Sequence, residues 1–314
     1  MVLEPTQGAL EADPRPTARQ TIGVVIPAYN AERTIGAVLQ ALAEQEPSPS
    51  EVIVVDDSST DRTAELAETA GARVLATDGA GFAGAARNTG WEAATTDVVV
   101  FLDADSIPAP GWGAGLERAL AEYPGSVVGC ARTFTGKTRW GWVARLQFET
   151  PYLPRGGPRP AGFVSSLCMA VPRDLPLRFA ASYGGEDGVF CADAHAAGIP
   201  VIFDPRFHAF HDHGRDTFVS LRRLQRRRAY ALSRVGAVQR ESLRKRIFSR
   251  VPVHYFLLLR LPRIFWRVRD RPELRRAFLR HLPLLVVAEW TLGASALRYV
   301  FRRPPLRDQA RSFR

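Results

Sequence analysis

The sequence contains little cysteine, no apolar leader and no internal repeat. Only three of its 314 residues are cysteines (Cys130, Cys168 and Cys191), and their spacing supports neither a disulfide framework nor a zinc site. The first 20 residues are polar and rich in proline, without the apolar core of a signal peptide. We therefore expect residues 1–20 to form a disordered lead-in, and we expect a cytoplasmic protein in a reducing compartment.

Negative charge is scarce in the last third of the chain. Residues 206–314 contain 27 lysine and arginine residues but only 7 aspartate and glutamate residues, whereas residues 1–205 contain 15 and 25. The formal net charge of +10 therefore hides an acidic body followed by a basic tail. Such an asymmetry indicates two functional zones and excludes a uniformly basic protein.

Strand and helix patterns alternate through the first half of the sequence. Buried-strand patterns occur at residues 21–30, 51–59, 72–77 and 97–105, and helical spacing of apolar residues occurs at 31–45, 60–71 and 84–95. This alternation predicts an α/β fold with a Rossmann-like, mostly parallel central sheet and helices on both faces. Residues 111–205 are more mixed, with strand candidates and a glycine-led helix, and the tail contains three helical stretches.

Polar side chains follow three of these predicted strands, in the sequences PAYN, DDSS and DAD. The carboxyl ends of parallel strands meet at one edge, where ligands bind in open α/β sheets. Within VVVFLDADS, Asp103 and Asp105 are two residues apart and would point to the same face of a strand. Two adjacent carboxylates repel each other unless a cation lies between them. A polar turn and a divalent metal site are both compatible with this pattern.

Four motifs follow one another between residues 21 and 213: VVIPAYNAERTI, VIVVDDSSTDRT, GAARNTGWEAATTDVVVFLDADS and GGEDGVFCADAHAAGIPVIFDP. In this order they resemble glycosyltransferase family 2, whose members are inverting enzymes with the GT-A fold. The resemblance implies a GT-A domain over residues 21–213, with a nucleotide-sugar half at about 21–106 and an acceptor half at about 107–213. Residues 214–314 lie beyond it, and their composition predicts a basic, amphipathic helical tail.

The resemblance implies a donor-binding role for residues of the first three motifs. Asp57, together with Asp56, would accept hydrogen bonds from a uracil ring N–H or from ribose hydroxyls, and Arg87 would approach the diphosphate or the base. Alternatively, DDSSTD merely turns the chain and caps the next helix, and Arg87 is a solvated residue on a helix surface. Three further residues would line the nucleotide site: Pro27, Tyr29 and Glu32.

By the same resemblance, Asp103 and Asp105 form the DXD motif that holds Mg²⁺ or Mn²⁺ against the diphosphate of the sugar nucleotide. Hard cations prefer carboxylate and phosphate oxygens, and the metal would relieve the repulsion between the two acids. Asp105 would be the direct ligand, with Asp103 nearer the ribose. His211 lies after FDP, where many GT-A enzymes have a late histidine in the metal shell, whereas His208 and His213 are expected at the surface.

The GGEDG motif would supply the acceptor chemistry. By resemblance, Asp187 is the general base that deprotonates the acceptor hydroxyl, and Glu186 shapes the acceptor side. The alternative is that both acids simply occupy the first turn of a helix, where the helix dipole favours negative charge.

These assignments imply a metal-dependent, inverting transfer of a sugar from a nucleoside diphosphate sugar to a hydroxyl of a sugar or lipid-linked acceptor, with UDP favoured over GDP. A nucleotidyltransferase is one alternative, because it uses a similar sheet and metal but releases pyrophosphate. A nucleic-acid-binding protein is the other, through arginine-rich stretches such as RRLQRRRAYALSR. No recognisable nucleic-acid fold accompanies those stretches, and the acidic body would repel phosphates, so we expect no nucleic-acid partner.

Residues 282–300 of the tail approach the length needed to cross a bilayer. Their leucine and valine residues favour insertion, but Glu289 near the centre offsets them, so the insertion free energy is near zero. A helix lying in the membrane interface, held by arginines and by Trp266 and Trp290, is favoured over a helical cap packed on the domain. We therefore expect peripheral association with the inner face of the cell membrane, where the acceptor is lipid-linked or a surface glycan.

Overall fold

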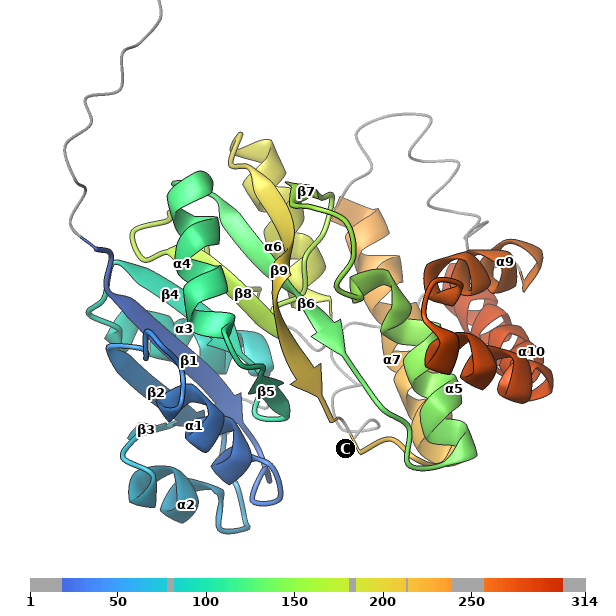
Figure 1. Ribbon diagram of the computed structural model, residues 1–314, viewed down its shortest axis with the longest axis horizontal. Coiled ribbons are helices and arrows are strands. Elements are labelled where there is room, and N and C mark those ends of the chain that lie inside the picture. The colour runs from blue at the N-terminus through green and yellow to red at the C-terminus, as the bar shows by residue number, and fades with distance from the viewer. Residues whose placement is uncertain (1–18, 78–81, 181–184, 213, 239–256, 302–314) are drawn as a thin grey trace, which may run out of the picture.

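The computed structural model describes residues 19–77, 82–180, 185–212, 214–238 and 257–301 (Figure 1). Several predictions concern residues that are not described: residues 1–18 of the predicted disordered lead-in, residues 239–256 and 302–314 of the tail, and His213. The centre of the molecule is one sheet with the strand order β3-β2-β1-β4-β8-β6-β9-β5, and β7 pairs with β9. The strands are β1 (Ile22–Ala28), β2 (Glu51–Asp56), β3 (Arg73–Ala76), β4 (Val98–Leu102), β5 (Ser106–Pro108), β6 (Val127–Thr133), β7 (Arg159–Pro160), β8 (Cys168–Pro172) and β9 (Val201–His211).

The strands of the first half are parallel to one another. Strand β1 pairs in parallel with β2 and β4, and β2 pairs in parallel with β3. In the second half β6 and β9 are parallel, whereas β8 runs antiparallel between β4 and β6, and β5 and β7 run antiparallel to β9. The predicted mostly parallel sheet is therefore confirmed. Of its antiparallel members, β7 and β8 come from the part of the sequence with the mixed pattern, and β5 lies just before that part.

Helices cover both faces of the sheet, as predicted (Figure 1). One face packs against α1 (Ile35–Ala43), α2 (Thr63–Thr69) and α4 (Trp112–Glu122), and the other against α3 (Ala83–Ala93) and α6 (Glu186–Ala196). Alternate residues of β1 supply the two cores, with Val24 and Ile26 on the first face and Val25 on the second. Burial on both faces explains why these strands are continuous apolar runs rather than alternating ones.

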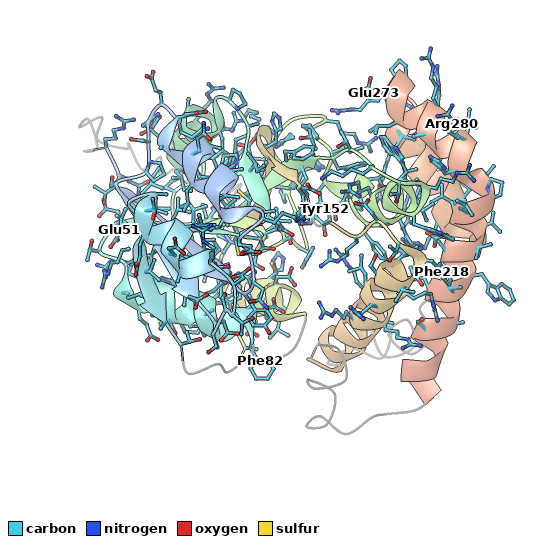
Figure 2. The ribbon with its side chains drawn as sticks, turned by 90° about the horizontal axis from the view of Figure 1, so that it is seen from below. Glu51, Phe82, Tyr152, Phe218, Glu273 and Arg280 are labelled. Carbon is cyan, nitrogen blue, oxygen red and sulfur yellow. The ribbon has the colours of Figure 1, made fainter. Side chains whose placement is uncertain are left out.

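A helical layer covers one end of the sheet (Figures 1 and 2). It consists of α5 (Arg139–Phe148), α7 (Phe218–Val238), α9 (Leu257–Val268) and α10 (Pro272–Phe301). A third core joins Val143 and Leu146 of α5 to Leu221 of α7 and to Leu285 and Leu292 of α10. The sequence places α5 inside the predicted GT-A domain and the other helices in the tail, so one hydrophobic core crosses the predicted boundary.

Helix α10 contains the segment that approached transmembrane length. In the part of the chain that the structure describes, no helix is long and apolar enough to cross a membrane. Glu289 is buried on the inner side of α10, where its carboxylate accepts hydrogen bonds from Arg260 Nε at 2.6 Å and Gln147 Nε2 at 3.1 Å. The inner face of α10 therefore packs on the protein, as in the alternative in which the tail is a helical cap on the domain.

Candidate active site

The loops after β1 and β2 are joined by hydrogen bonds at the carboxyl edge of the sheet. Asn30 has a left-handed φ of 49°, and its side-chain oxygen accepts a hydrogen bond from the Thr60 backbone N–H at 2.8 Å. The Glu32 carboxylate accepts a hydrogen bond from the Arg62 backbone N–H at 3.2 Å. Tyr29 is exposed beside them, and Pro27 is half-buried at the end of β1. The three residues predicted to line a nucleotide site therefore lie on one edge, with Glu32 also holding the second loop.

Asp56 ends β2 and Asp57 follows it, and the two residues differ in their contacts. The Asp57 carboxylate accepts a hydrogen bond from Thr77 Oγ1 at 2.6 Å, which joins the ends of β2 and β3. Asp56 Oδ2 accepts one from the Ser59 backbone N–H at 3.2 Å, whereas its buried Oδ1 has no hydrogen-bond partner among the described residues. The turn after β2 thus provides a hydrogen-bond donor for only one of the two Asp56 carboxylate oxygens.

Arg87 is the residue that joins the third and fourth sequence motifs. It projects from α3, is almost fully buried, and donates to Asp103 Oδ1 at 2.6 Å and to Glu186 Oε1 at 3.2 Å. Burial alone would lower the pKa of Arg87, but the carboxylates of Asp103 and Glu186 outweigh it and raise that pKa. The alternative of a solvated arginine on a helix surface is therefore wrong.

Asp103 and Asp105 contact different cationic groups. Strand β4 ends at Leu102, and a turn follows in which the Ser106 N–H donates to the Asp103 carbonyl at 2.9 Å. The alternation of side chains along a strand therefore does not extend across these two residues. Asp103 binds Arg87, whereas Asp105 Oδ1 lies 3.4 Å from His211 Nε2. Within the described residues, no three acidic, histidine or cysteine side chains are grouped closely enough to enclose a metal ion.

His211 is buried at the end of β9 between two carboxylates. Its Nδ1 lies 3.5 Å from Glu149 Oε2, and Glu149 accepts a hydrogen bond from the buried Arg132 at 2.9 Å. Burial alone would lower the pKa of His211, but Asp105 and Glu149 outweigh it and raise that pKa to about 9. The sequence analysis identified His211 but missed Glu149 and Arg132. Their only signal in the sequence is a charged residue within the apolar strand β6, for Arg132, and directly after α5, for Glu149.

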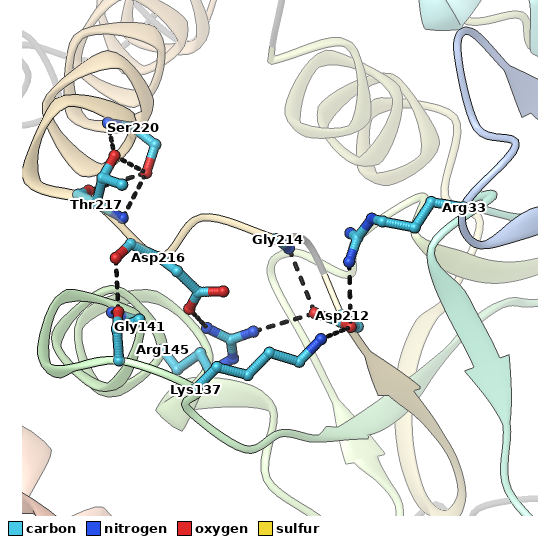
Figure 3. A network of polar contacts seen from close by, with 10 residues as sticks. Arg33, Lys137, Gly141, Arg145, Asp212, Gly214, Asp216, Thr217 and Ser220 are labelled. Atoms are coloured by element: carbon cyan, nitrogen blue, oxygen red, sulfur yellow. Dashed lines mark hydrogen bonds and ion pairs between the residues drawn. The ribbon is translucent and has the colours of Figure 1, made fainter. Parts of the chain in front are cut away.

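A polar network holds the chain between β9 and α7 (Figure 3). Asp212 accepts hydrogen bonds from Lys137 at 3.0 Å and from the buried Arg145 at 3.3 Å, and Arg33 lies 3.8 Å away. Arg145 also donates to Asp216 at 3.3 Å. The network therefore fixes the segment that carries His211 on one side and leads into α7 on the other.

Three arginines of this segment and of α7 interact electrostatically with acids of the site or with one another, and the sequence analysis assigned them only to the tail: Arg215, Arg227 and Arg228. Burial lowers the pKa of Arg215, the Asp105 carboxylate opposes this shift, and Arg228 and Arg227 add to it. The Arg228 guanidinium lies over the Phe148 ring, 4.9 Å from its centroid. These influences place Arg215 within electrostatic reach of Asp105, and Arg228 of α7 within reach of Glu149, so part of the basic tail belongs to the site.

The two acids of the GGEDG motif lie in the first turn of α6, after Gly185 with its left-handed φ of 80°. Asp187 is half-buried and accepts a hydrogen bond from the Gly188 N–H at 2.9 Å. Burial, followed by repulsion from Asp187, raises the pKa of Glu186. Glu186 Oε2 has no hydrogen-bond partner among the described residues. His208, which precedes His211 on β9, is half-buried, and burial lowers its pKa.

Comparison with known proteins agrees with this arrangement. Residues 23–175 match the model of glycosyl transferase family 2. An uncharacterized glycosyltransferase of Mycobacterium tuberculosis is 36% identical over 129 residues, which are 41% of this chain and 56% of that protein. Glycosyltransferase AglE of Haloferax volcanii is 35% identical over 114 residues, which are 34% of this chain and 36% of that protein. The matches thus span about half or less of these relatives.

Solved structures share the fold over most of the chain. Mannosyltransferase PcManGT from Pyrobaculum calidifontis, in complex with GDP-Man and Mn²⁺, has a TM-score of 0.63 at 19% identity and covers 93% of this chain and 90% of that chain. GalNAc-T7 with UDP, GalNAc and Mn²⁺ has a TM-score of 0.56 at 16% identity, covering 84% and 55%. At such identities the likeness shows the fold alone, which is the predicted GT-A fold.

Proposed function

We propose that this protein is a glycosyltransferase that moves a sugar from a nucleoside diphosphate sugar to an acceptor hydroxyl, with inversion at the anomeric carbon. The observation that carries the proposal is the double contact of Arg87. This one buried side chain joins Asp103, in the donor motif after β4, to Glu186, in the acceptor motif at the start of α6. Donor and acceptor groups are thereby held on the same edge of the sheet.

Unsatisfied polar atoms support a ligand at this edge. Buried polar groups are normally hydrogen-bonded, and leaving one unpaired costs about 1–3 kcal/mol. Among the described residues, four buried side-chain atoms without partners lie close to the predicted motifs: Asp56 Oδ1, Arg87 Nε, Ser106 Oγ and Glu186 Oε2. We assign Asp56 and Asp57 to the base or ribose, with a lean toward UDP, and Pro27, Tyr29 and Glu32 to the surrounding contacts.

We assign the divalent cation, Mg²⁺ or Mn²⁺, to Asp105 and His211. The Asp105 Oδ1 and His211 Nε2 atoms lie 3.4 Å apart, and they would form a donor pair for such an ion once the ion displaces the proton that the raised pKa of His211 favours. Diphosphate oxygens would supply further ligands. Asp103 is closer to a ribose role, because Arg87 already holds its carboxylate. When bound, the cation would neutralise charge on the departing nucleoside diphosphate. Arg215, in the segment before α7, and Arg228, in α7, would also attract the negative charge of the departing diphosphate.

In the proposed transfer step, Asp187 is the general base. The acceptor hydroxyl oxygen forms a bond to the anomeric carbon while the bond from that carbon to the diphosphate oxygen breaks. Asp187 accepts the hydroxyl proton as the new bond forms, and the electron pair of the broken bond leaves with the nucleoside diphosphate. Glu186 lies next to Asp187 in the sequence. Its Oε1 accepts a hydrogen bond from Arg87, and its Oε2, which has no partner among the described residues, would orient the acceptor. Attack from the side opposite the leaving group inverts the anomeric carbon.

The acceptor is proposed to be a lipid-linked or surface glycan met at the inner face of the cell membrane. The basic tail supports this location, because anionic lipids attract arginine side chains near the surface. The acidic body of the chain, which would repel phosphate backbones, argues against a nucleic-acid partner.

A panel of sugar nucleotides tests the proposed function. The full chain should gain thermal stability with one or a few nucleoside diphosphate sugars in the presence of Mn²⁺, and the gain should shrink with EDTA. Asp105→Ala and His211→Ala should lose the Mn²⁺-dependent part, whereas His208→Ala on the same strand should keep it. Release of a nucleoside diphosphate identifies the reaction, and release of pyrophosphate from a nucleoside triphosphate would instead establish a nucleotidyltransferase.

A further inference from the structure

Helix α10 is apolar on two opposite faces. The inner face packs in the helical layer through Leu274, Ala277, Phe278, Leu285, Ala288 and Leu292. The outer face carries four exposed apolar side chains, with exposed fractions of 57% for Leu279, 37% for Val286, 45% for Val287 and 73% for Trp290. At 3.6 residues per turn these four fall on one strip along the helix. We call Leu279, Val286, Val287 and Trp290 the outer strip.

Positive charge surrounds the beginning of the outer strip. Three exposed arginines lie on the first turns of the helix: Arg275, Arg276 and Arg280. Figure 2 shows Arg280 and Glu273 at this end of α10, on the far side of the molecule from Glu51. The exposed acids here are Asp270 and Glu273, whereas Glu289 is turned inward and bonded to Arg260. Residues 257–295 contain eight arginines against these three acids, so the surroundings of the strip are cationic.

The other predicted anchor is already engaged by its neighbours. The guanidinium groups of Arg155 and Arg269 lie over the Trp266 ring, at 4.4 and 5.0 Å from its centroid. A ring held in this way between cations is a weaker candidate for insertion than the 73% exposed Trp290. The strip on α10 is therefore the better candidate for a docking surface.

We propose that the outer strip of α10 docks on an anionic lipid surface, with the helix axis lying in the plane of the membrane interface. The inference rests on the proposed function, because it names the surface that brings the enzyme to a membrane-borne acceptor. Exposed aliphatic side chains with a tryptophan, bordered by arginines, match the boundary between acyl chains and anionic headgroups. A second copy of the chain is disfavoured as the occupant, because pairing two such faces brings arginines of the same charge together.

A flotation experiment tests the docking surface on the full chain. Vesicles of phosphatidylcholine with phosphatidylglycerol should carry the protein, and vesicles of phosphatidylcholine alone should carry at least tenfold less. The double variant Val287→Ser/Trp290→Ser should bind the anionic vesicles at least tenfold more weakly, as should Arg276→Glu/Arg280→Glu. Val219→Ser, which alters an exposed valine at the start of α7, should bind like the wild type. Brominated lipids should quench tryptophan fluorescence in the wild type and much less in Trp290→Phe.

Several results would overturn the inference. Equal binding to both vesicle types, wild-type binding by both double variants, or unchanged quenching in Trp290→Phe would each do so. A dimer in solution that Val287→Ser/Trp290→Ser dissociates would assign the strip to a second copy instead. Sugar-nucleotide stabilisation is measured on the same proteins. A wild type that binds a sugar nucleotide but not anionic vesicles would refute the docking surface only. A wild type that binds anionic vesicles but no sugar nucleotide would refute the proposed function only.

Discussion

Two arginines, Arg87 beside the sheet edge and Arg260 in the helical layer, are each held by a buried or largely buried carboxylate. Around Arg260 the network is complete: both oxygens of Glu289 accept hydrogen bonds, and Gln147 is bonded in turn to Gln225. Around Arg87 it is incomplete, because Arg87 Nε and Glu186 Oε2 have no partners among the described residues.

The difference separates a structural network from a binding site. A buried polar network that is fully satisfied holds its elements in one arrangement, whereas unsatisfied buried atoms cost free energy until a ligand supplies their partners. The satisfied network joins α5, α7, α9 and α10, whose inner faces pack together in one hydrophobic core. The unsatisfied network lies where the motifs that we propose for the donor and for the acceptor meet.

The largest expected effect lies on the catalytic side of this comparison. Asp187→Asn should lower turnover by about 10²- to 10⁴-fold, because the amide cannot take the acceptor proton. Sugar-nucleotide binding should be nearly unchanged. Both quantities are measured on the purified full chain, by initial rates of nucleoside diphosphate release and by thermal shift. Asp193→Asn removes a carboxylate from the same helix and serves as the matched control, and near-normal turnover of Asp187→Asn would end the assignment of the base.

Substitutions in the satisfied network should lower the free energy of unfolding without changing sugar-nucleotide binding. Arg260→Met leaves Glu289 buried without its cation, and we expect the free energy of unfolding to fall by about 3–5 kcal/mol. Urea unfolding measures this loss, and the folded variant should still bind the sugar nucleotide. Arg260→Met/Glu289→Leu removes both charges and should recover most of the loss. If Arg260→Met unfolds like the wild type, the network is not a stabilising contact.

The pH dependence of the free energy of unfolding tests the satisfied network through Glu289. Burial raises the pKa of Glu289 above its ordinary value near 4.5. The folded state then keeps this proton at pH values where the unfolded chain has lost it. Its contribution to stability is therefore present at low pH and is lost as the pH rises from about 4.5 through the raised folded pKa. The loss amounts to about 1.4 kcal/mol for each pH unit that separates the unfolded and folded pKa values.

The variant Glu289→Gln should remove this part of the pH dependence. Urea midpoints of the wild type and Glu289→Gln are compared across the acidic range, where the raised pKa of Glu186 contributes equally to both proteins and cancels. A difference between the two curves that does not change with pH would contradict the raised pKa of Glu289.

The smallest expected effect concerns the exposed end of the network in Figure 3. Lys137 is 59% exposed and binds Asp212, which the buried Arg145 also holds. Lys137→Met should therefore change the free energy of unfolding by less than about 1 kcal/mol. Arg145→Met should cost clearly more, because it leaves Asp212 and Asp216 without a buried partner. Equal effects of the two substitutions in urea unfolding would show that burial does not distinguish these contacts.

The alternation of apolar runs and helical patterns was enough to predict the parallel half of the sheet and the edge where its polar residues gather. The reason is physical: side-chain periodicity reports which face of an element is buried, and parallel strands present their carboxyl ends together. The order of the motifs likewise pointed to Arg87, Asp103 and Glu186. That the first side chain bonds both of the others could not be read from their spacing, because they are distant in sequence.

Only the tertiary structure decided how the remaining charges are used. Strand alternation placed Asp103 and Asp105 on one face, but the turn after Leu102 sends them to Arg87 and to His211. Glu149 became part of the site because α5 ends beside β9, a contact that no local pattern encodes.

The apolar content of α10 was legible in the sequence, but what covers each of its faces was not. A helix with apolar side chains all around has a composition close to that of a membrane span, and Glu289 looked like an obstacle to insertion. Packing against α5 and α9 buries one face and gives Glu289 its partners, while the opposite face remains exposed. Periodicity determines which residues share a face, whereas only the packing of distant segments determines which face meets protein and which meets another surface.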